Sequence, residues 1–169
     1  VPDLYVAWHA GVSYWKNYKL INKYSIGIEI SNPGHNNYKN FSKKQIISIL
    51  KLSKFLSNKY KINSKFILGH SDIAPDRKKD PGEKFPWKYL SARKIGIWHN
   101  LDQKKIKLKR NKKISKFNKQ AFIQNLFKIG YSRNFIKKNS IYSKLLVKAF
   151  QRRFRQELVN GIIDHECLL

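Results

Sequence analysis

The segment 69–82, Gly-His-Ser-Asp-Ile-Ala-Pro-Asp-Arg-Lys-Lys-Asp-Pro-Gly, constrains the fold of this chain more than any other stretch. It follows a short apolar run that resembles the end of a strand, a place where rigid scaffolds commonly carry functional loops. Pro75 and Pro81 lack backbone donors, and glycines stand at both ends, so we expect an irregular loop and no helix. Such a path can fold back and aim His70 and Asp80 at one point.

An imidazole nitrogen and a carboxylate oxygen are ligands that suit zinc, so His70 and Asp80 are our candidate metal ligands. Hydrolysis of an amide at zinc also needs a base for the attacking water and a cation for the oxyanion. Glu29 is polar within an apolar stretch and is the candidate general base. Lys78 lies two residues before Asp80, so an extended backbone would aim both side chains to the same side. Together these four residues predict a metallohydrolase.

Each of these residues also has a simpler interpretation. His70 could be a hydrogen-bonded loop histidine, and Asp80 before a proline could merely start a turn. Glu29 could face solvent from an edge strand, and Lys78 could be one of many surface lysines. For Asp72 we favour the simple interpretation, in which its carboxylate caps the local backbone. Taken singly, none of the four candidates indicates catalysis. Their occurrence together, in the order Glu29, His70, Lys78 and Asp80, does.

The pattern of residues 1–90 predicts a compact unit of the α/β class. Residues 25–30 alternate in polarity as in a strand, and 66–68 predict a second strand. Between them Ser42 and Gln45 form a capping-box pattern, followed by apolar residues at helical spacing to about Tyr60. A strand, a helix and a strand in this order predict a βαβ-type crossover.

Composition separates the remainder of the 169 residues into two parts. Residues 104–113 form a cationic run without interleaved aromatic residues, and we interpret this region as a solvated linker in preference to a polyanion-binding arm. Residues 116–169 return to amphipathic helical spacing, with Gly130 as a helix stop. We therefore expect three segments, with bounds 1–98, 99–115 and 116–169.

The formal net charge of +26 indicates attraction to polyanions such as nucleic acid, anionic lipid or an acidic polymer. Lys, Asn and Ile are enriched together, however, so codon bias from an AT-rich genome explains much of this charge. No apolar run approaches the roughly 20 residues needed to cross a bilayer. The start of the chain does not resemble a secretory signal, and the absence of methionine leads us to expect a piece of a longer protein.

Four motifs in this order resemble the zinc-dependent N-acetylmuramoyl-L-alanine amidases, the relatives of the peptidoglycan recognition proteins. They are Ala-Trp-His-Ala-Gly at 7–11, Ser-Ile-Gly-Ile-Glu-Ile at 25–30, Gly-His-Ser-Asp-Ile-Ala-Pro at 69–75 and Arg-Lys-Lys-Asp-Pro-Gly at 77–82. The resemblance covers about residues 1–98. It implies a mixed central sheet flanked by helices, and cleavage of the bond between the muramic acid lactyl group and L-alanine of the peptide stem.

Carried over residue by residue, the resemblance implies that His70 and Asp80 bind zinc. Glu29 matches the catalytic glutamate of the family and Lys78 its transition-state lysine. The first motif lies near the substrate groove in the family, so Trp8 and His9 are candidate substrate-binding residues. The family also has a first zinc histidine some tens of residues before this motif, at a position that this sequence does not include, and we therefore expect the chain to be truncated at its N-terminus. His9 and His35 are poor substitutes for that ligand.

Residues 149–155 and 160–164 resemble the helical peptidoglycan-binding module that follows some of these amidases. That architecture implies a cell-envelope protein, often an outer-membrane lipoprotein, whereas single-domain relatives recycle muropeptides in the cytoplasm. We expect peptidoglycan or muropeptides as partners and no specific nucleic acid. The alternatives are a degenerate amidase that binds peptidoglycan without cutting it and, third, a basic nucleic-acid-binding protein.

Overall fold

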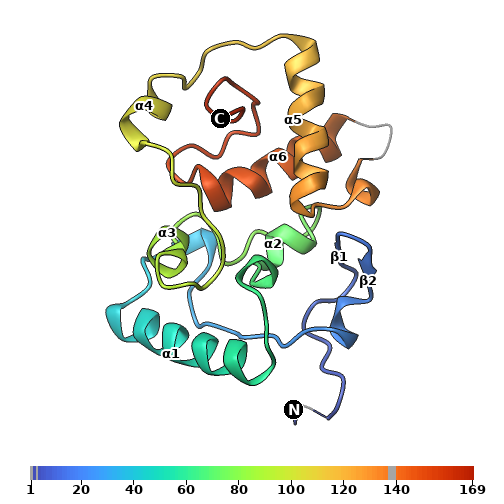
Figure 1. Cartoon of the computed structure of the whole chain (residues 1–169), viewed down its shortest axis with the longest axis vertical. Coiled ribbons are helices and arrows are strands. Elements are labelled where there is room, and N and C mark those ends of the chain that lie inside the picture. Colours follow the sequence, from blue (N-terminus) through green and yellow to red (C-terminus); the bar gives the residue numbers. More distant parts are fainter. Residues whose placement is uncertain (1, 3, 137–139) are drawn as a thin grey trace.

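The computed structural model describes residues 2, 4–136 and 140–169, and helices predominate among them (Figure 1). Strands β1 (Tyr14–Trp15) and β2 (Tyr18–Lys19) form an antiparallel pair in which Trp15 lies opposite Tyr18. The six α-helices of the described residues are α1 (Lys43–Lys59), α2 (His70–Ile73), α3 (Trp87–Ser91), α4 (Gln103–Lys107), α5 (Lys116–Ile129) and α6 (Ser140–Phe154). Short 3-10 turns lie at Ile21–Lys23, His35–Asn37, Ser64–Phe66 and Arg133–Phe135. The predicted α/β class is confirmed, as a helical structure with a small two-stranded sheet.

The prediction of strands at 25–30 and 66–68 was wrong for the described structure. Residues 25–30 have no regular secondary structure, and Ser64–Phe66 form a 3-10 turn. The expected βαβ crossover is therefore absent from the described part of the chain, where the sheet consists of β1 and β2 alone. A strand exists only through hydrogen bonds to a neighbouring strand, and alternation in the sequence does not supply that neighbour.

Helix α1 begins as the capping-box pattern predicted. The Ser42 hydroxyl accepts from the Gln45 backbone N–H at 3.2 Å, and the Gln45 side chain accepts from the Ser42 N–H at 2.9 Å. The Gln45 amide also donates to the Ser31 carbonyl at 2.7 Å, which attaches the irregular segment before the helix. The helix then ends at Lys59, close to the predicted limit at Tyr60.

The segment 69–82 contains one helical turn, which corrects the expectation that no part of it is helical. Helix α2 starts at His70 and ends at Ile73, before Pro75 could interrupt it. The carboxylate of Asp72 accepts from the Gly69 N–H at 2.8 Å, as the capping interpretation of Asp72 predicts. The loop nature of the remainder of the segment is confirmed.

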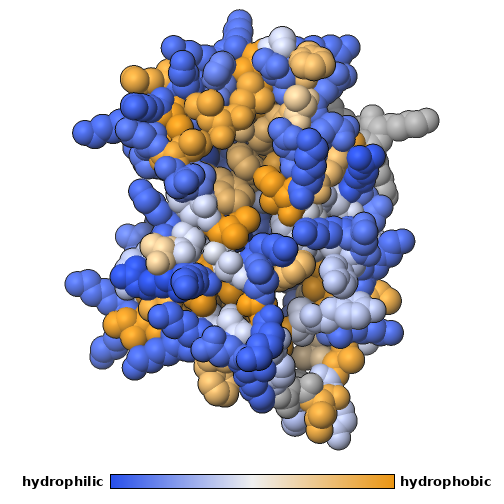
Figure 2. Space-filling model, in the orientation of Figure 1, coloured by the Kyte–Doolittle hydropathy of each residue, from blue (hydrophilic) through white to orange (hydrophobic). Residues whose placement is uncertain are grey.

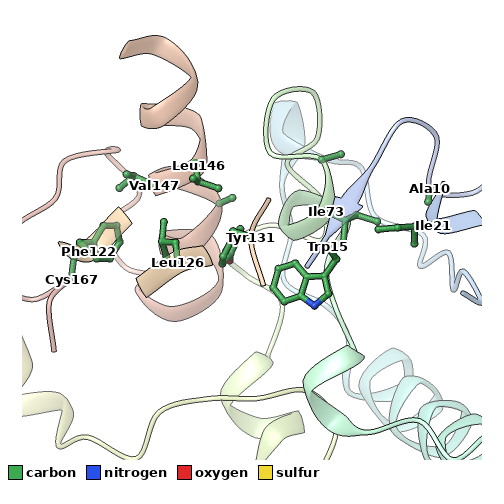
Figure 3. Packing of buried hydrophobic residues seen from close by; sticks show 12 residues of the cluster. Ala10, Trp15, Ile21, Ile73, Phe122, Leu126, Tyr131, Leu146, Val147 and Cys167 are labelled. Carbon is green, nitrogen blue, oxygen red and sulfur yellow. The ribbon is translucent and has the colours of Figure 1, made fainter. Parts of the chain in front are cut away.

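A hydrophobic core joins the N-terminal and C-terminal parts of the chain (Figure 3). Ile73 from α2 and Trp15 from β1 belong to the same cluster as Leu126 from α5. The rings of Trp15 and Tyr131 meet edge to face with centroids 5.2 Å apart. In Figure 1, α2 lies between α1 and α6, and it contacts both β1 and α6. The residues that carry the predicted site thus pack directly on the C-terminal segment.

Gly130 permits this close approach of the two parts. Its φ of 143° lies in the region that favours glycine, and its carbonyl accepts from the Lys16 N–H at 2.6 Å. A Cβ at this position would overlap the indole of Trp15. The predicted helix stop at Gly130 is confirmed, because α5 ends at Ile129.

A second cluster packs α1 against α3. Its buried members are Phe41, Ile49, Phe85, Trp87, Leu90 and Ile95. Because α3 follows the segment 69–82 in the chain, this cluster supports the other end of the predicted site.

The C-terminal segment encloses buried ion pairs. Arg155 donates to Asp164 at 2.6 Å, and both side chains are buried. Arg110 donates to Glu166 through two nitrogens, at 2.6 and 2.8 Å, and so attaches the cationic run to this segment. The bounds 1–98, 99–115 and 116–169 stay predictions, although α4 lies in the middle one.

Hydrophilic side chains cover most of the face shown in Figure 2, with smaller hydrophobic patches between them.

Candidate active site

A cavity of about 1110 Å³ brings the predicted catalytic residues together. Glu29, His70, Lys78 and Asp80 all line it, although Glu29 is 41 positions before His70 in the sequence. Its walls come from the irregular segment 25–32, from α1 and from α2 with the loop that follows. The four candidates therefore share one cavity, and their joint role in catalysis stays a prediction.

His70 and Asp80 lie side by side. Nδ1 of His70 is 3.1 Å from Oδ2 of Asp80, and the histidine side chain is 19% exposed against 59% for the aspartate. The interaction with the His70 ring lowers the pKa of the Asp80 carboxyl below its ordinary value. The backbone reinforces the pairing, because the Ser71 N–H donates to the Asp80 carbonyl at 2.9 Å.

The other ring nitrogen of His70 faces a backbone carbonyl. Nε2 lies 3.2 Å from the oxygen of Ala10, which can only accept, so Nε2 carries a hydrogen. This arrangement leaves Nδ1 directed at Asp80. A metal-binding histidine characteristically donates its second N–H to a carbonyl or carboxylate in this way, because that contact fixes the tautomer and the ring orientation.

His70 and Asp80 provide the types of donor atom that bind zinc, and together they could supply two ligands. Neutral imidazole and carboxylate are ordinary zinc donors, and a catalytic zinc site generally uses three protein ligands. Among the residues that the structure describes, no group of three or more His, Cys, Asp and Glu side chains could hold a metal ion. The pair His70–Asp80 offers two donors of the kind that zinc accepts, and its role as a metal site stays a prediction.

The two catalytic candidates lie on different walls of the cavity. Glu29 is exposed within the irregular segment, which matches neither a buried strand nor a paired edge strand. Lys78 is half-buried, and its N–H donates to the Ala74 carbonyl at 2.9 Å, just beyond α2. Both roles stay predictions.

Trp8 and His9 also line the cavity. The Trp8 side chain is 86% exposed, so the indole has an open face. Nε2 of His9 lies 2.8 Å from the Ser25 hydroxyl, and its ring packs so closely on Gly27 that a Cβ there would be within 2.6 Å. His35 also lines the cavity, and its Nε2 pairs with the Glu83 carboxylate at 3.3 Å.

Sequence reasoning assigned no role to Arg77, yet the structure connects this exposed residue to the backbone beside His70. Its guanidinium donates to the carbonyls of Ala10 and Val12, with a distance of 2.7 Å from Nη2 to Val12. Ala10 is the residue whose carbonyl orients His70. Arg77 therefore connects the first motif with the loop after α2, and its place as the first residue of the fourth motif was the available signal.

Tyr38 is a second residue that sequence reasoning missed. Its hydroxyl donates to the Pro81 carbonyl at 2.7 Å and accepts from the Lys84 N–H at 2.9 Å. Burial raises the pKa of Tyr38 to about 12. These contacts hold the turn that begins directly after Asp80, and nothing in the local sequence pattern pointed to them.

Comparisons with known proteins identify relatives of this chain. A family profile described as N-acetylmuramoyl-L-alanine amidase matches residues 1–83. The amidase AmiD of Escherichia coli is 32% identical over 174 residues, which cover 98% of this chain and 62% of AmiD. The 1,6-anhydro-N-acetylmuramyl-L-alanine amidase AmpD of Haemophilus influenzae is 41% identical over 88 residues, 51% of this chain and 46% of AmpD. The chain thus spans less than two thirds of the length of either relative.

Solved structures extend the likeness to the whole chain. AmpDh3 from Pseudomonas aeruginosa superposes with a TM-score of 0.85 at 32% identity, covering 99% of this chain and 68% of AmpDh3. AmiD from E. coli, in complex with the substrate anhydro-N-acetylmuramic acid-L-Ala-D-gamma-Glu-L-Lys, superposes with a TM-score of 0.84 at 31% identity, covering 99% and 67%. The chain belongs to the N-acetylmuramoyl-L-alanine amidase family.

No helix in the described parts of the chain has the length and apolar character that crossing a membrane requires.

Proposed function

We propose that this chain hydrolyses the amide bond between N-acetylmuramic acid and L-alanine in peptidoglycan or in muropeptides released from it. The observation that carries the proposal is the convergence of Glu29, His70, Lys78 and Asp80 on one cavity. Membership of the amidase family supports the same activity. A relative supports the substrate class, since AmiD of E. coli was solved in complex with an anhydro-muramyl peptide.

The residues of the cavity divide the chemistry between them. The Glu29 carboxylate takes a proton from the attacking water, a general-base step that typically contributes 10²–10⁴-fold to the rate. The Lys78 ammonium stabilises the negative charge on the oxyanion of the tetrahedral intermediate. Trp8 offers an exposed ring beside these groups against which a sugar or peptide can lie.

His70 and Asp80 hold the zinc ion in this proposal. When bound, zinc supplies Lewis-acid chemistry, polarising the amide carbonyl and lowering the pKa of a water molecule to about 7. The Ala10 carbonyl keeps the Nε2 hydrogen of His70 in place, so that Nδ1 remains available as a donor to the metal. Asp80 remains ionised over a wide pH range, because its pKa is lowered.

A specific observation favours a second candidate, a protein that binds peptidoglycan without cutting it. The described residues group two ligands and not three, so zinc affinity and water activation are expected to be weak. The cavity and the exposed Trp8 would still serve a binder.

One assay separates the two candidates. The chain is incubated with an anhydro-muramyl tripeptide and with insoluble peptidoglycan, each with added zinc or with chelator, and the new L-alanine amino group is quantified. The amidase predicts zinc-dependent release of the free peptide. A binder predicts co-sedimentation with the insoluble wall and no release.

Glu29→Gln is the decisive variant. It retains the shape of the side chain but cannot accept a proton, so release should fall by about 10²–10⁴-fold while zinc binding is unchanged. Release that persists in this variant would contradict the assigned base. Lys79→Gln is the matched control for Lys78→Gln, because both neutralise a lysine of the same loop and Lys79 does not line the cavity.

The proposal extends to location and accessory segments. We place the chain in the bacterial cell envelope, where its substrate lies, with cytoplasmic recycling as the alternative, and we assign residues 116–169 as a peptidoglycan-binding-like segment. Fractionation of expressing cells tests the location, and recovery only in the cytoplasmic fraction would favour the alternative.

A further inference from the structure

We propose that Arg153 and Tyr131 are positioning residues that hold His70 in place through the carboxylate of Asp72. The inference rests on the proposed zinc site and assigns to the C-terminal segment a direct role in it. Both residues lie more than 58 positions after Asp72 in the sequence, yet each donates a hydrogen bond to it.

The Asp72 carboxylate is the centre of this arrangement. Its side chain is 2% exposed, so its negative charge requires internal partners. Oδ2 accepts from the Gly69 N–H at 2.8 Å, and the Asp72 N–H donates to the Gly69 carbonyl at 3.0 Å. Gly69 directly precedes His70, so Asp72 determines where the backbone that carries the ligand begins its helical turn.

Arg153 of α6 fixes that carboxylate from the C-terminal side. Its side chain is 3% exposed, and Nη1 donates to Oδ2 of Asp72 at 2.7 Å. Nη2 donates to the Ile67 carbonyl at 3.1 Å, three residues before His70. The guanidinium also stacks on Trp87, with Cζ 3.9 Å from the ring. Only a planar, forked cation reaches all three of these partners.

Tyr131 supplies the remaining contact. Its buried hydroxyl donates to Oδ1 of Asp72 at 2.8 Å, the oxygen that Arg153 does not use. The two carboxylate oxygens are therefore held by two different parts of the C-terminal segment, one after α5 and one in α6. Rotation of the carboxylate, and with it displacement of the Gly69–His70 backbone, is blocked from both sides.

The chain contains a matched control in Arg155. This arginine is two residues from Arg153, is equally buried, and donates to Asp164 at 2.6 Å. Its guanidinium contacts Leu158, Asn160, Ile162, Asp164 and Glu166, all within the C-terminal segment. Arg155→Lys thus perturbs the same segment without touching Asp72.

The experiment compares Arg153→Lys, Tyr131→Phe and Arg155→Lys in the 169-residue chain. For each protein, zinc affinity is measured by competition with a chromophoric chelator, thermal unfolding by circular dichroism, and the His70 ring nitrogens of the metal-free protein by long-range ¹H–¹⁵N NMR. We expect zinc affinity to fall about 10- to 100-fold in Arg153→Lys, as for loss of outer-shell support, and about threefold or more in Tyr131→Phe. Both should shift the His70 nitrogen signals.

Arg155→Lys should lower the unfolding temperature while zinc affinity and the His70 signals remain as in the wild type. Equal loss of zinc affinity in Arg155→Lys would overturn the inference, as would unchanged affinity and unchanged His70 signals in both other variants. If Arg153→Lys does not fold, Tyr131→Phe decides alone, since it removes one hydroxyl only. If the wild type binds no zinc, the proposed metal site fails, and the His70 signals by themselves decide whether Arg153 and Tyr131 position the ring.

Discussion

At the scale of single residues, the site depends on contacts that orient His70. One ring nitrogen faces the Ala10 carbonyl and the other faces Asp80, so the ring has little rotational freedom. Arg77 holds Ala10, and Asp72 holds Gly69. Each of these contacts joins His70 to a different part of the chain, and small changes around the ring should therefore affect ligand geometry.

Gly69→Ala should weaken zinc binding and destabilise the fold. A Cβ at this position would lie 2.7 Å from Cδ of Pro81, a distance that real Cβ contacts do not reach. Relief of the clash would push Pro81, and Asp80 directly before it, away from His70. A zinc titration and a thermal melt check this expectation, and wild-type values in both would show that the loop accommodates the methyl group freely.

Tyr38→Phe should change how stability depends on high pH. The folded pKa of about 12 lies above the ordinary value of 10.0, so between these values the unfolded state ionises first and the folded state is progressively destabilised as pH rises. The contribution is fully present below pH 10. Urea unfolding at pH 8, 10 and 11 should therefore show a smaller alkaline loss of unfolding free energy in Tyr38→Phe than in the wild type. Parallel curves for the two proteins would contradict the assignment.

At the scale of elements, the three long helices α1, α5 and α6 were predictable, whereas the short helices α2, α3 and α4 and the strands were not. Helix α1 has its capping box and its apolar spacing within 43–59, and α5 has its stop at Gly130, so the signals are local. The expected strands at 25–30 and 66–68 depend on a pairing partner that local pattern cannot report. For the same reason, the prediction of helices within 116–169 was correct, whereas the prediction of two strands in the N-terminal part was wrong.

Ser42→Ala should destabilise the protein by about 1 kcal/mol through loss of the helix cap. The Ser42 hydroxyl accepts from the Gln45 N–H, which would otherwise lack a partner at the helix start. Urea denaturation measures the change. Lys54→Ala, at an exposed position in the middle of the same helix, is the control and should remain within about 0.5 kcal/mol of the wild type.

At the scale of the whole molecule, the core is shared between the part that carries the catalytic candidates and the C-terminal segment. Ile73 and Leu126 belong to one cluster, and Asp72 pairs with Arg153 across the same boundary. Removal of one partner from such a buried ion pair is strongly destabilising, by roughly 3–5 kcal/mol. We therefore expect these two parts of the chain to unfold together.

Leu126→Ala tests this expectation. Leu126 is 1% exposed, and its truncation should cost about 2–5 kcal/mol. Hydrogen exchange should accelerate at the Ala74 N–H, which donates to the His70 carbonyl, as well as in α5 itself. Phe117→Ala on the same helix is the control, because Phe117 is 76% exposed. Accelerated exchange confined to residues 116–169 would indicate two independent units.

The sequence by itself determined the family, the helices α1, α5 and α6, the capping role of Asp72 and the candidate site residues, because motif order, side-chain spacing and capping residues act over short distances. Only the tertiary structure decided that Glu29 shares a cavity with His70, that Arg77 and Tyr38 support the site, and that Asp72 is held by Tyr131 and Arg153. These contacts join positions tens of residues apart. They arise when burial of the shared core forces each enclosed charge and hydroxyl to find a partner, and no local pattern specifies which partner that is.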